Sequence, residues 1–541
     1  MSSSSRRAVL RGLALAAAAT AVPLSGRAPA SASSGISHEG SSGTFHEGSS
    51  GAAGAPPLRQ MRGMWIASVV NINWPSRTGL SAAQQKAEYV AWLDLARARG
   101  LNSVFVQIRP TADAFWPSPY EPWSQYLTGV QGGDPGYDPL AFLVAETHRR
   151  GLAFHAWFNP YRVSMQADPA LLHPDHPGRR HPEWIVPYGG KLYYNPGMPE
   201  VRAFVQDAMM DAVTRYDIDG LHFDDYFYPV NTTAFDDSEA YARHGGGFPD
   251  LAAWRRENVD LLVREMQQRV RRAKPEVAWG ISPSGIWRNR ATDPLGSETG
   301  GGQSYDNLHA DTRGWVKKGW LDYIAPQLYW YIGQSNADYA KLVPWWSDVA
   351  AGTGTQLWIG QAAYKAGAAG QPVEWSRPDE LSRHLTLNQD HPEVGGDIWY
   401  NSGDVRDDRI GSISAVVTGH YTRPALPPLL PRLASGRAPG RPLVPLARLV
   451  DGGVELRVLA TGRDVPFQYA IFRLDRPARP GDLADARHLI ATVPAGRDLR
   501  WVDPAGTVGA HYHVVAVDRA GRLSPPSAGR RAVRAGRDPG R

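Results

Sequence analysis

The segment 217–229 (DIDGLHFDDYFYP) carries carboxylates, a histidine and tyrosines within the alternation of a buried strand. A period of two places His222, Asp224 and Tyr226 on one face and apolar residues on the other. A carboxylate turned towards a protein interior is costly unless it has partners or a function. Asp224 is therefore the first candidate for a catalytic residue. Asp225, at the tip of the strand where the pleat relaxes, can turn to the same side.

Two carboxyl groups in one site are what hydrolysis of a glycosidic bond requires. One is a protonated acid that donates to the leaving oxygen, and the other is ionised. Asp224 supplies one of the two, and its partner is either Asp225 or Asp113, which follows a different strand. Three acidic residues of a later loop are further candidates for the partner: Glu298, Asp306 and Asp311.

Other chemistries lack the residues that they need. The chain has no cysteine, which excludes a thiolate nucleophile, and no H-E-x-x-H, Walker or G-x-S-x-G motif. His155 and His222 are possible metal ligands together with the aspartates, but no H-x-H pair accompanies them. We therefore predict a site without a metal and without a cofactor.

The elements that would position these residues alternate regularly along the chain. Strands are expected at 62–70, 102–109, 153–158, 220–226, 277–282, 323–329, 356–360 and 396–400. Helices are expected at 81–99, 138–150, 198–216, 251–273, 304–318, 338–350, 379–388 and 405–418. Eight such units, without a Gly-rich phosphate loop after the first strand, predict an α/β fold of the (β/α)8 TIM-barrel type. A doubly wound open sheet is the alternative.

Aromatic and polar residues gather at the carboxyl ends of the expected strands, where a barrel carries its active site. Sugar rings have apolar faces that stack on aromatic side chains and hydroxyl rims that need polar partners. The chain is rich in suitable aromatics, with 19 tryptophans and 22 tyrosines. We expect the substrate to be bound by Trp65, Arg109, Trp157, Asn159, Arg162, His222, Tyr226, Gln327, Tyr329, Trp330 and Trp399.

The N-terminal segments are typical of an exported protein. Residues 1–32 combine the arginine pair Arg6-Arg7, an apolar stretch and an A-x-A site, as a twin-arginine signal peptide does. Residues 33–60 are rich in Gly and Ser and repeat HEGSSG, which predicts a flexible leader. We expect a secreted or cell-wall-associated chain without a membrane segment once the signal is removed.

The C-terminal segments predict a small all-β module. Residues 422–445 are rich in Pro, Arg and Gly and are interpreted as a linker, and residues 531–541 as a disordered tail. Between them, residues 446–530 resemble a fibronectin type III sandwich, with Tyr512 as its tyrosine corner. From Pro424 onward there are 19 arginines against 10 acidic residues. That excess is either a solvated surface or a site for an anionic wall polymer, and no nucleic-acid motif accompanies it.

Several motifs in order resemble the glycosyl hydrolase-like 10 family. They are RGMW at 62–65, FVQIRP at 105–110 with Asp113, HAWFNPYR at 155–162, the segment 219–229, WGISP at 279–283, YIAPQLYW at 323–330 and GDIWY at 396–400. The resemblance covers residues 61–421. It implies a bacterial envelope hydrolase that cleaves peptidoglycan glycan strands freed of their stem peptides.

A more distant likeness connects the fourth strand to chitinase-type barrels, which read D-G-x-D-x-D-x-E there. Asp219, His222, Asp224 and Tyr226 occupy that frame, so a tyrosine stands where the chitinase has its acid. Because tyrosine has an ordinary pKa of about 10, the proton donor must come from elsewhere. The leading hypothesis is a hydrolase of cell-wall glycan. Its alternatives are a hydrolase of an exopolysaccharide such as poly-N-acetylglucosamine, or a non-catalytic glycan-binding protein.

Overall fold

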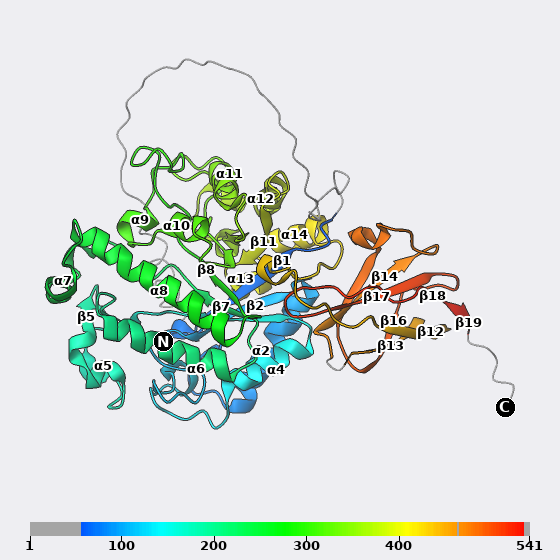
Figure 1. The fold of residues 1–541 in the computed structure, drawn as a ribbon, viewed down its shortest axis with the longest axis horizontal. Helices are drawn as coiled ribbons and strands as arrows, with labels where there is room; N and C mark the ends of the chain where they lie inside the picture. Colours follow the sequence, from blue (N-terminus) through cyan, green and yellow to red (C-terminus); the bar gives the residue numbers. More distant parts are fainter. Residues whose placement is uncertain (1–55, 463–464, 535–541) are drawn as a thin grey trace, which may run out of the picture.

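The computed structural model describes residues 56–462 and 465–534, and within them eight parallel strands close into a barrel (Figure 1). The predicted signal peptide, leader residues 33–55 and tail residues 535–541 lie outside the described residues. In barrel order the strands are β1 (Met61–Ile66), β11 (Val394–Trp399), β10 (Gln356–Gln361), β9 (Tyr323–Ile324), β8 (Ala278–Ile281), β7 (Gly220–Phe223), β3 (Ala153–Phe158) and β2 (Ser103–Arg109). The TIM-barrel prediction is confirmed and the open sheet is excluded.

Helices follow the strands on the outside of the barrel. They are α2 (Ala82–Ala98), α4 (Pro139–Arg149), α6 (Pro199–Arg215), α8 (Leu251–Ala273), α10 (Thr312–Lys317), α11 (Tyr339–Ala350), α12 (Glu380–Asn388) and α14 (Ser412–His420). The α4 helix begins as its sequence suggests, because Asp138 accepts the amide of Ala141 and Pro139 opens the first turn.

Two helices predicted as single elements are divided. The segment 304–318 forms α9 (Ser304–Asn307) and α10, since His309 between them has a positive φ of 53°. The segment 405–418 falls into α13 (Ser402–Asp407) and α14, interrupted at Asp408 (φ 41°) and Gly411 (φ 77°). Left-handed backbone of this kind cannot continue a right-handed helix.

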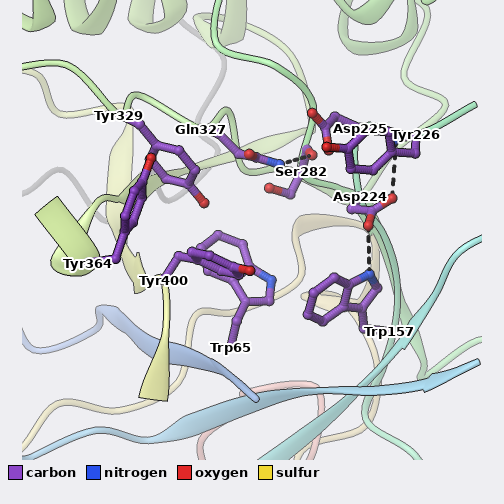
Figure 2. A pocket seen from close by; sticks show the side chains of 10 residues that line it. All are labelled: Trp65, Trp157, Asp224, Asp225, Tyr226, Ser282, Gln327, Tyr329, Tyr364 and Tyr400. Atoms are coloured by element: carbon purple, nitrogen blue, oxygen red, sulfur yellow. Dashed lines mark hydrogen bonds between the residues drawn. The ribbon is translucent and has the colours of Figure 1, made fainter. Parts of the chain in front are cut away.

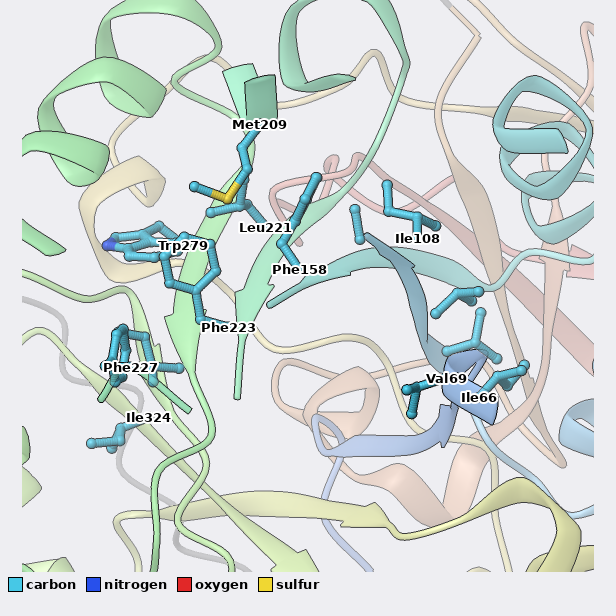
Figure 3. Close-up of a cluster of buried hydrophobic side chains, with 14 of the residues drawn as sticks. Ile66, Val69, Ile108, Phe158, Met209, Leu221, Phe223, Phe227, Trp279 and Ile324 are labelled. Atoms are coloured by element: carbon cyan, nitrogen blue, oxygen red, sulfur yellow. The ribbon is translucent and has the colours of Figure 1, made fainter. Parts of the chain in front are cut away.

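Alternate side chains of the strands enter two separate cores. Outward-facing residues such as Leu221 and Phe223 pack against helix residues, for example Met209, in the layer between sheet and helices (Figure 3). Inward-facing residues fill the barrel interior, among them Phe105 and Tyr323. The interior is therefore a packed core, and a site can open only at one of its ends.

A small antiparallel sheet is inserted after the third barrel strand. It consists of β4 (Arg162–Ser164), β6 (Lys191–Tyr194) and β5 (Ile185–Tyr188) in that order. The β5–β6 hairpin turns at Gly189 and Gly190, both with positive φ. Because the insertion follows the carboxyl end of β3, it stands on the face of the barrel where an active site is expected.

Two four-stranded sheets follow the barrel and pack around a core that includes Leu456 and Val514. One contains β16 (Asp498–Asp503), β13 (Gly453–Leu459), β12 (Leu443–Val450) and β19 (Val533–Arg534). The other contains β15 (Leu489–Pro494), β14 (Gln468–Leu474), β17 (His511–Val517) and β18 (Arg530–Arg531). This is a β-sandwich. The Tyr512 hydroxyl donates to Asp503 Oδ2 at 2.8 Å rather than to a backbone carbonyl, and the fibronectin type III relationship stays a prediction.

The segment expected to be a linker is packed rather than free. Leu426 is fully buried in a cluster with Phe472 of the sandwich, and the Gln60 amide donates to Leu426 O at 3.1 Å. Arg519 of the sandwich donates to Asp217 Oδ1 at 2.5 Å, just before β7. The sandwich therefore docks at the amino ends of the barrel strands, away from the face that their carboxyl ends form. Within the described ranges, no helix combines the length and apolarity needed to span a bilayer.

Candidate active site

A pocket opens at the carboxyl ends of the barrel strands and contains two carboxylates (Figure 2). It encloses about 690 Å³, its open mouth included. Its walls come from the ends of six strands, β1, β3, β7, β8, β9 and β11, and from the loop after β10. The lining residues are Trp65, Trp157, Asp224, Asp225, Tyr226, Ser282, Gln327, Tyr329, Tyr364 and Tyr400.

Asp224 and Asp225 both reach this pocket because β7 ends earlier than the alternation predicts. The strand stops at Phe223, so the alternation of a pleated strand does not force the two aspartates onto opposite faces. Asp224 is 6% exposed, and Asp225 is partly exposed at the pocket wall. Two carboxyl groups that are adjacent in sequence can therefore serve one site.

Asp224 is held by three N–H donors. Its Oδ2 accepts from Asn159 Nδ2 at 2.5 Å and from Trp157 Nε1 at 3.2 Å, and its Oδ1 accepts from the Tyr226 amide at 3.2 Å. Burial raises the pKa of Asp224, and the charge of Arg162 and these donors oppose that rise. Hydrogen bonds donated to a carboxylate favour its ionised form. The three donors therefore favour Asp224 over Asp225 as the ionised member of the pair.

Asp225 has the opposite character. Burial, and then the negative charge of Asp224, raise the pKa of Asp225 to about 7. The side chain of Gln327 and the charge of Arg162 oppose this shift without cancelling it. A carboxyl group with such a pKa is protonated in about half of the molecules at neutral pH, so it can serve as a general acid there. The two environments therefore divide the roles of acid and ionised carboxylate between neighbouring residues.

The orientation of Asn159 is fixed by a chain of amides that begins at the backbone. The amides of Ser68 and Val69 donate to Gln107 Oε1 at 3.0 and 2.9 Å, so Gln107 must turn its NH₂ group the other way. Gln107 Nε2 donates to Asn159 Oδ1 at 2.6 Å, which leaves the Asn159 NH₂ group to donate to Asp224. The backbone amides of the loop after β1 therefore determine that Asn159 turns its NH₂ group towards Asp224.

Gln107→Glu is expected to raise the pH at which the enzyme gains activity by about one unit. The new carboxylate keeps the backbone donors but turns an acceptor towards Asn159 Oδ1, so the Asn159 amide reverses and Asp224 loses a donor to its ionised form. The pKa of Asp224 then rises, and a higher pH is needed to ionise it. The measurement is the acidic limb of kcat/KM against pH.

Gln267→Glu is the matched control for this variant, because Gln267 is a buried glutamine that donates to Gly319 O at 2.7 Å. We expect it to lose stability while keeping the acidic limb in place. An unshifted limb in Gln107→Glu would mean that the amide chain supports only the fold.

Aromatic rings form the wall of the pocket opposite the carboxylates (Figure 2). The rings of Tyr329 and Tyr400 stack with centroids 6.1 Å apart, and Tyr364 contacts both, at 5.7 and 5.9 Å. Trp65 meets Tyr400 at 6.1 Å. Such a wall offers flat apolar faces to a sugar ring while the carboxylates lie on the other side.

A neutral histidine network beneath the pocket holds Trp65. Trp65 Nε1 donates to His222 Nε2 at 3.1 Å, so His222 carries its proton on Nδ1, 3.0 Å from the Tyr323 hydroxyl. Burial and the neighbouring His155 keep the pKa of His222 well below its ordinary value. His222 therefore supports the pocket from below rather than lining it.

Asp113, the alternative partner of Asp224, does not line the pocket. It is fully buried in the loop after β2, where its Oδ1 accepts from Thr111 Oγ1 at 3.2 Å. Burial raises the pKa of Asp113 to about 7 as well. Its shifted pKa therefore reflects a closed loop interior, and the structure does not bring it together with Asp224.

Arg109 belongs to a buried ion pair outside the pocket. It forms a two-bonded ion pair with Glu121, at 2.7 and 2.5 Å, and donates to the carbonyl of Asn159 at 2.5 Å. Both side chains of the pair are fully buried. Arg109 therefore anchors the loop that carries Asn159 and is not among the residues that line the pocket.

The structure places two of the expected tryptophans elsewhere. Trp399 is buried in the layer between sheet and helices, and Trp330 packs against that layer. The alternation explains Trp399, since Ile398 faces the barrel interior and Tyr400, two residues on, follows it to the pocket. That pattern was available in the sequence and identifies Tyr400.

Ser282 and Tyr364 complete the lining that the sequence analysis left out. Ser282 follows β8. Tyr364 lies in a short helical turn after β10, and the sequence has no periodic pattern there that would predict this turn. Among the described residues, no group of three or more His, Asp or Glu side chains gathers as a metal site would require.

The comparisons with known proteins agree with this architecture. The model of the family described as Glycosyl hydrolase-like 10 matches residues 60–377. Glycosyl hydrolase YngK of Bacillus subtilis (strain 168) is 49% identical over 395 residues, which cover 72% of this chain and 77% of the relative. Glycosyl hydrolase DigH of Escherichia coli (strain K12) is 41% identical over 362 residues, covering 63% of this chain and 82% of the relative.

Among solved structures, the chain is similar to the glycoside hydrolase domain of PgaB (BpsB) from Bordetella bronchiseptica. It has a TM-score of 0.45 and 13% identity, and the alignment covers 67% of this chain and 99% of that domain. The family match spans seven of the eight barrel strands, from β1 to β10. The chain belongs to the Glycosyl hydrolase-like 10 family.

Proposed function

We propose that this glycoside hydrolase, once exported, cleaves the glycan strands of peptidoglycan from which the stem peptides have been removed. The observation that carries the proposal is the pair of carboxyl groups, Asp224 and Asp225, that line one aromatic pocket. Asp225 donates a proton to the leaving oxygen, and Asp224 remains ionised to stabilise the positive charge that develops on the sugar ring.

The aromatic wall supports a substrate made of consecutive sugar rings. Tyr400, Tyr329 and Trp65 present ring faces on one side, while Ser282 and Gln327 present polar groups on another (Figure 2).

The proposal is tested by incubating the mature chain with three polymers and analysing the products by mass spectrometry. The polymers are peptide-free glycan strands, intact sacculi and poly-N-acetylglucosamine. We expect soluble fragments from the peptide-free strands, at least tenfold more than from the other two, with a mass increase of one water per cleavage. Cleavage of poly-N-acetylglucosamine alone would move the substrate to an exopolysaccharide. Binding of the strands without cleavage would identify a glycan-binding protein.

A further inference from the structure

Arg162 is a buried cation beside the pocket that forms no ion pair with the acidic residues of the described chain. Its Nε donates to Pro110 O at 3.0 Å, and the residue is only 5% exposed. Neither terminal nitrogen has a protein acceptor within the described ranges, yet neither is sealed from solvent. Arg109, by contrast, donates to Glu121 through Nε and Nη2 and to the carbonyls of Asn159 and Pro160 through Nη1.

The guanidinium of Arg162 lies next to a residue that lines the pocket. Its Cζ lies 5.7 Å from the centre of the Tyr226 ring, which lines the pocket. Burial raises the pKa values of Asp224, Asp225, Tyr226 and Tyr400, and the charge of Arg162 opposes the rise at all four of these lining residues. The positive charge of Arg162 therefore acts on much of the lining, and its two terminal nitrogens are available as donors. This combination suits the binding of an anion.

Lys191 adds a second cation at the same place. Arg162 of β4 stands opposite Tyr193 of β6, and Lys191 lies two residues before Tyr193, so both cations share one face of the small sheet. Lys191 is partly exposed and has no acidic partner among the described residues. Burial and then the charge of Arg162 lower the pKa of Lys191. Two like charges side by side are unfavourable without an anion between them.

We propose that Arg162 and Lys191 form an anion subsite at the edge of the pocket that binds a carboxylate of the saccharide. The inference rests on the proposed function and makes its substrate more specific. A muramic acid ring without its stem peptide carries a free lactyl carboxylate, whereas with the peptide attached the same carbon is a neutral, bulky amide. A guanidinium matches a carboxylate with two parallel hydrogen bonds. The subsite therefore selects strands that an amide-hydrolysing enzyme has already acted on.

The test compares peptide-free strands with the same strands after conversion of their carboxylates to methylamides. We expect the wild-type chain to cleave the amidated strands with a kcat/KM about tenfold lower, as the loss of one charge-assisted hydrogen bond implies. Lys191→Met is expected to lose about tenfold on the charged strands, mainly through KM, and to change little on the amidated ones. Lys191 is chosen over Arg162 because replacing Arg162 would also shift both aspartates.

Lys341→Met is the matched control, since Lys341 is an exposed lysine on α11 paired with Glu298 at 3.4 Å. It should leave both substrates unaffected. Equal cleavage of charged and amidated strands by the wild type would overturn the subsite. It would also be overturned if Lys191→Met kept the full wild-type preference for charged over amidated strands.

Absence of any cleavage by the wild type would contradict the proposed function instead, and binding then decides the subsite. The probes are the methyl glycoside of N-acetylmuramic acid and its methylamide, titrated against wild type and Lys191→Met. Tighter binding of the acid that the variant loses supports the subsite, and equal binding of the two overturns it.

Discussion

Asp224→Asn is expected to lower kcat/KM on peptide-free glycan strands by about 10³-fold or more, because it removes the ionised group that stabilises the transition state. Asparagine has the same shape, and its oxygen can still accept from Asn159 and Trp157. The fold should therefore survive. Thermal unfolding should occur at the same temperature or slightly higher, since a buried charge that is costly to desolvate has been removed. The measurements are product release by mass spectrometry and unfolding by circular dichroism.

Asp113→Asn is the companion variant that separates the two candidate partners. Asp113 is as deeply buried as Asp224 and is fully enclosed by its loop. Its neutralisation should leave activity within a few-fold of wild type. A loss as large as that of Asp224→Asn would contradict the assignment of the carboxylate pair to the pocket and would restore Asp113 as the partner.

Asp225→Asn is expected to lower activity on glycan strands by about 10²- to 10³-fold and to remove the basic limb of the pH profile. The pKa of Asp225 is raised to about 7. In the wild type the acid is therefore protonated below that pH, and kcat/KM falls as the pH rises through it. Asparagine has no proton to donate at any pH. The loss should be much smaller on an aryl glycoside whose leaving group needs no protonation.

Tyr226→Phe distinguishes Asp225 from the tyrosine that occupies the chitinase acid position. Burial and the two aspartates raise the pKa of Tyr226 well above its ordinary value, which makes it a poor donor. We expect Tyr226→Phe to keep the basic limb near pH 7. If the basic limb instead disappeared in Tyr226→Phe and remained in Asp225→Asn, Tyr226 would be the acid. In Asp224→Asn the residual activity should show this limb at lower pH, because the charge that raises the pKa of Asp225 is gone.

The amino-acid sequence determined the barrel, its eight strands and the family. Runs such as 153–158 and 356–360 have a strand period that depends on local residue order alone, and some of the helices between them, α8 and α11 among them, begin after a capping aspartate. Asp224 also stood out locally, because a carboxylate on the inward face of a strand needs a reason to be there. These features depend on neighbours only a few residues apart, which a sequence displays directly.

Tertiary structure decided which groups meet. It ended β7 at Phe223, so that Asp225 turned into the pocket, and it enclosed Asp113 in a loop held by its own contacts. It also brought Tyr364, from a short helical turn after β10, into the pocket wall.

The same holds for the segment before the sandwich. Its proline-rich composition predicts a linker, yet Leu426 is buried because a surface to cover it exists only once the barrel and the sandwich have formed. The sequence specifies periodicity and residue chemistry, whereas side-chain partners hundreds of residues apart follow from the closure of the barrel. Gln107, Asn159 and Asp224 come from three different strand ends and form one chain of hydrogen bonds only when those ends meet.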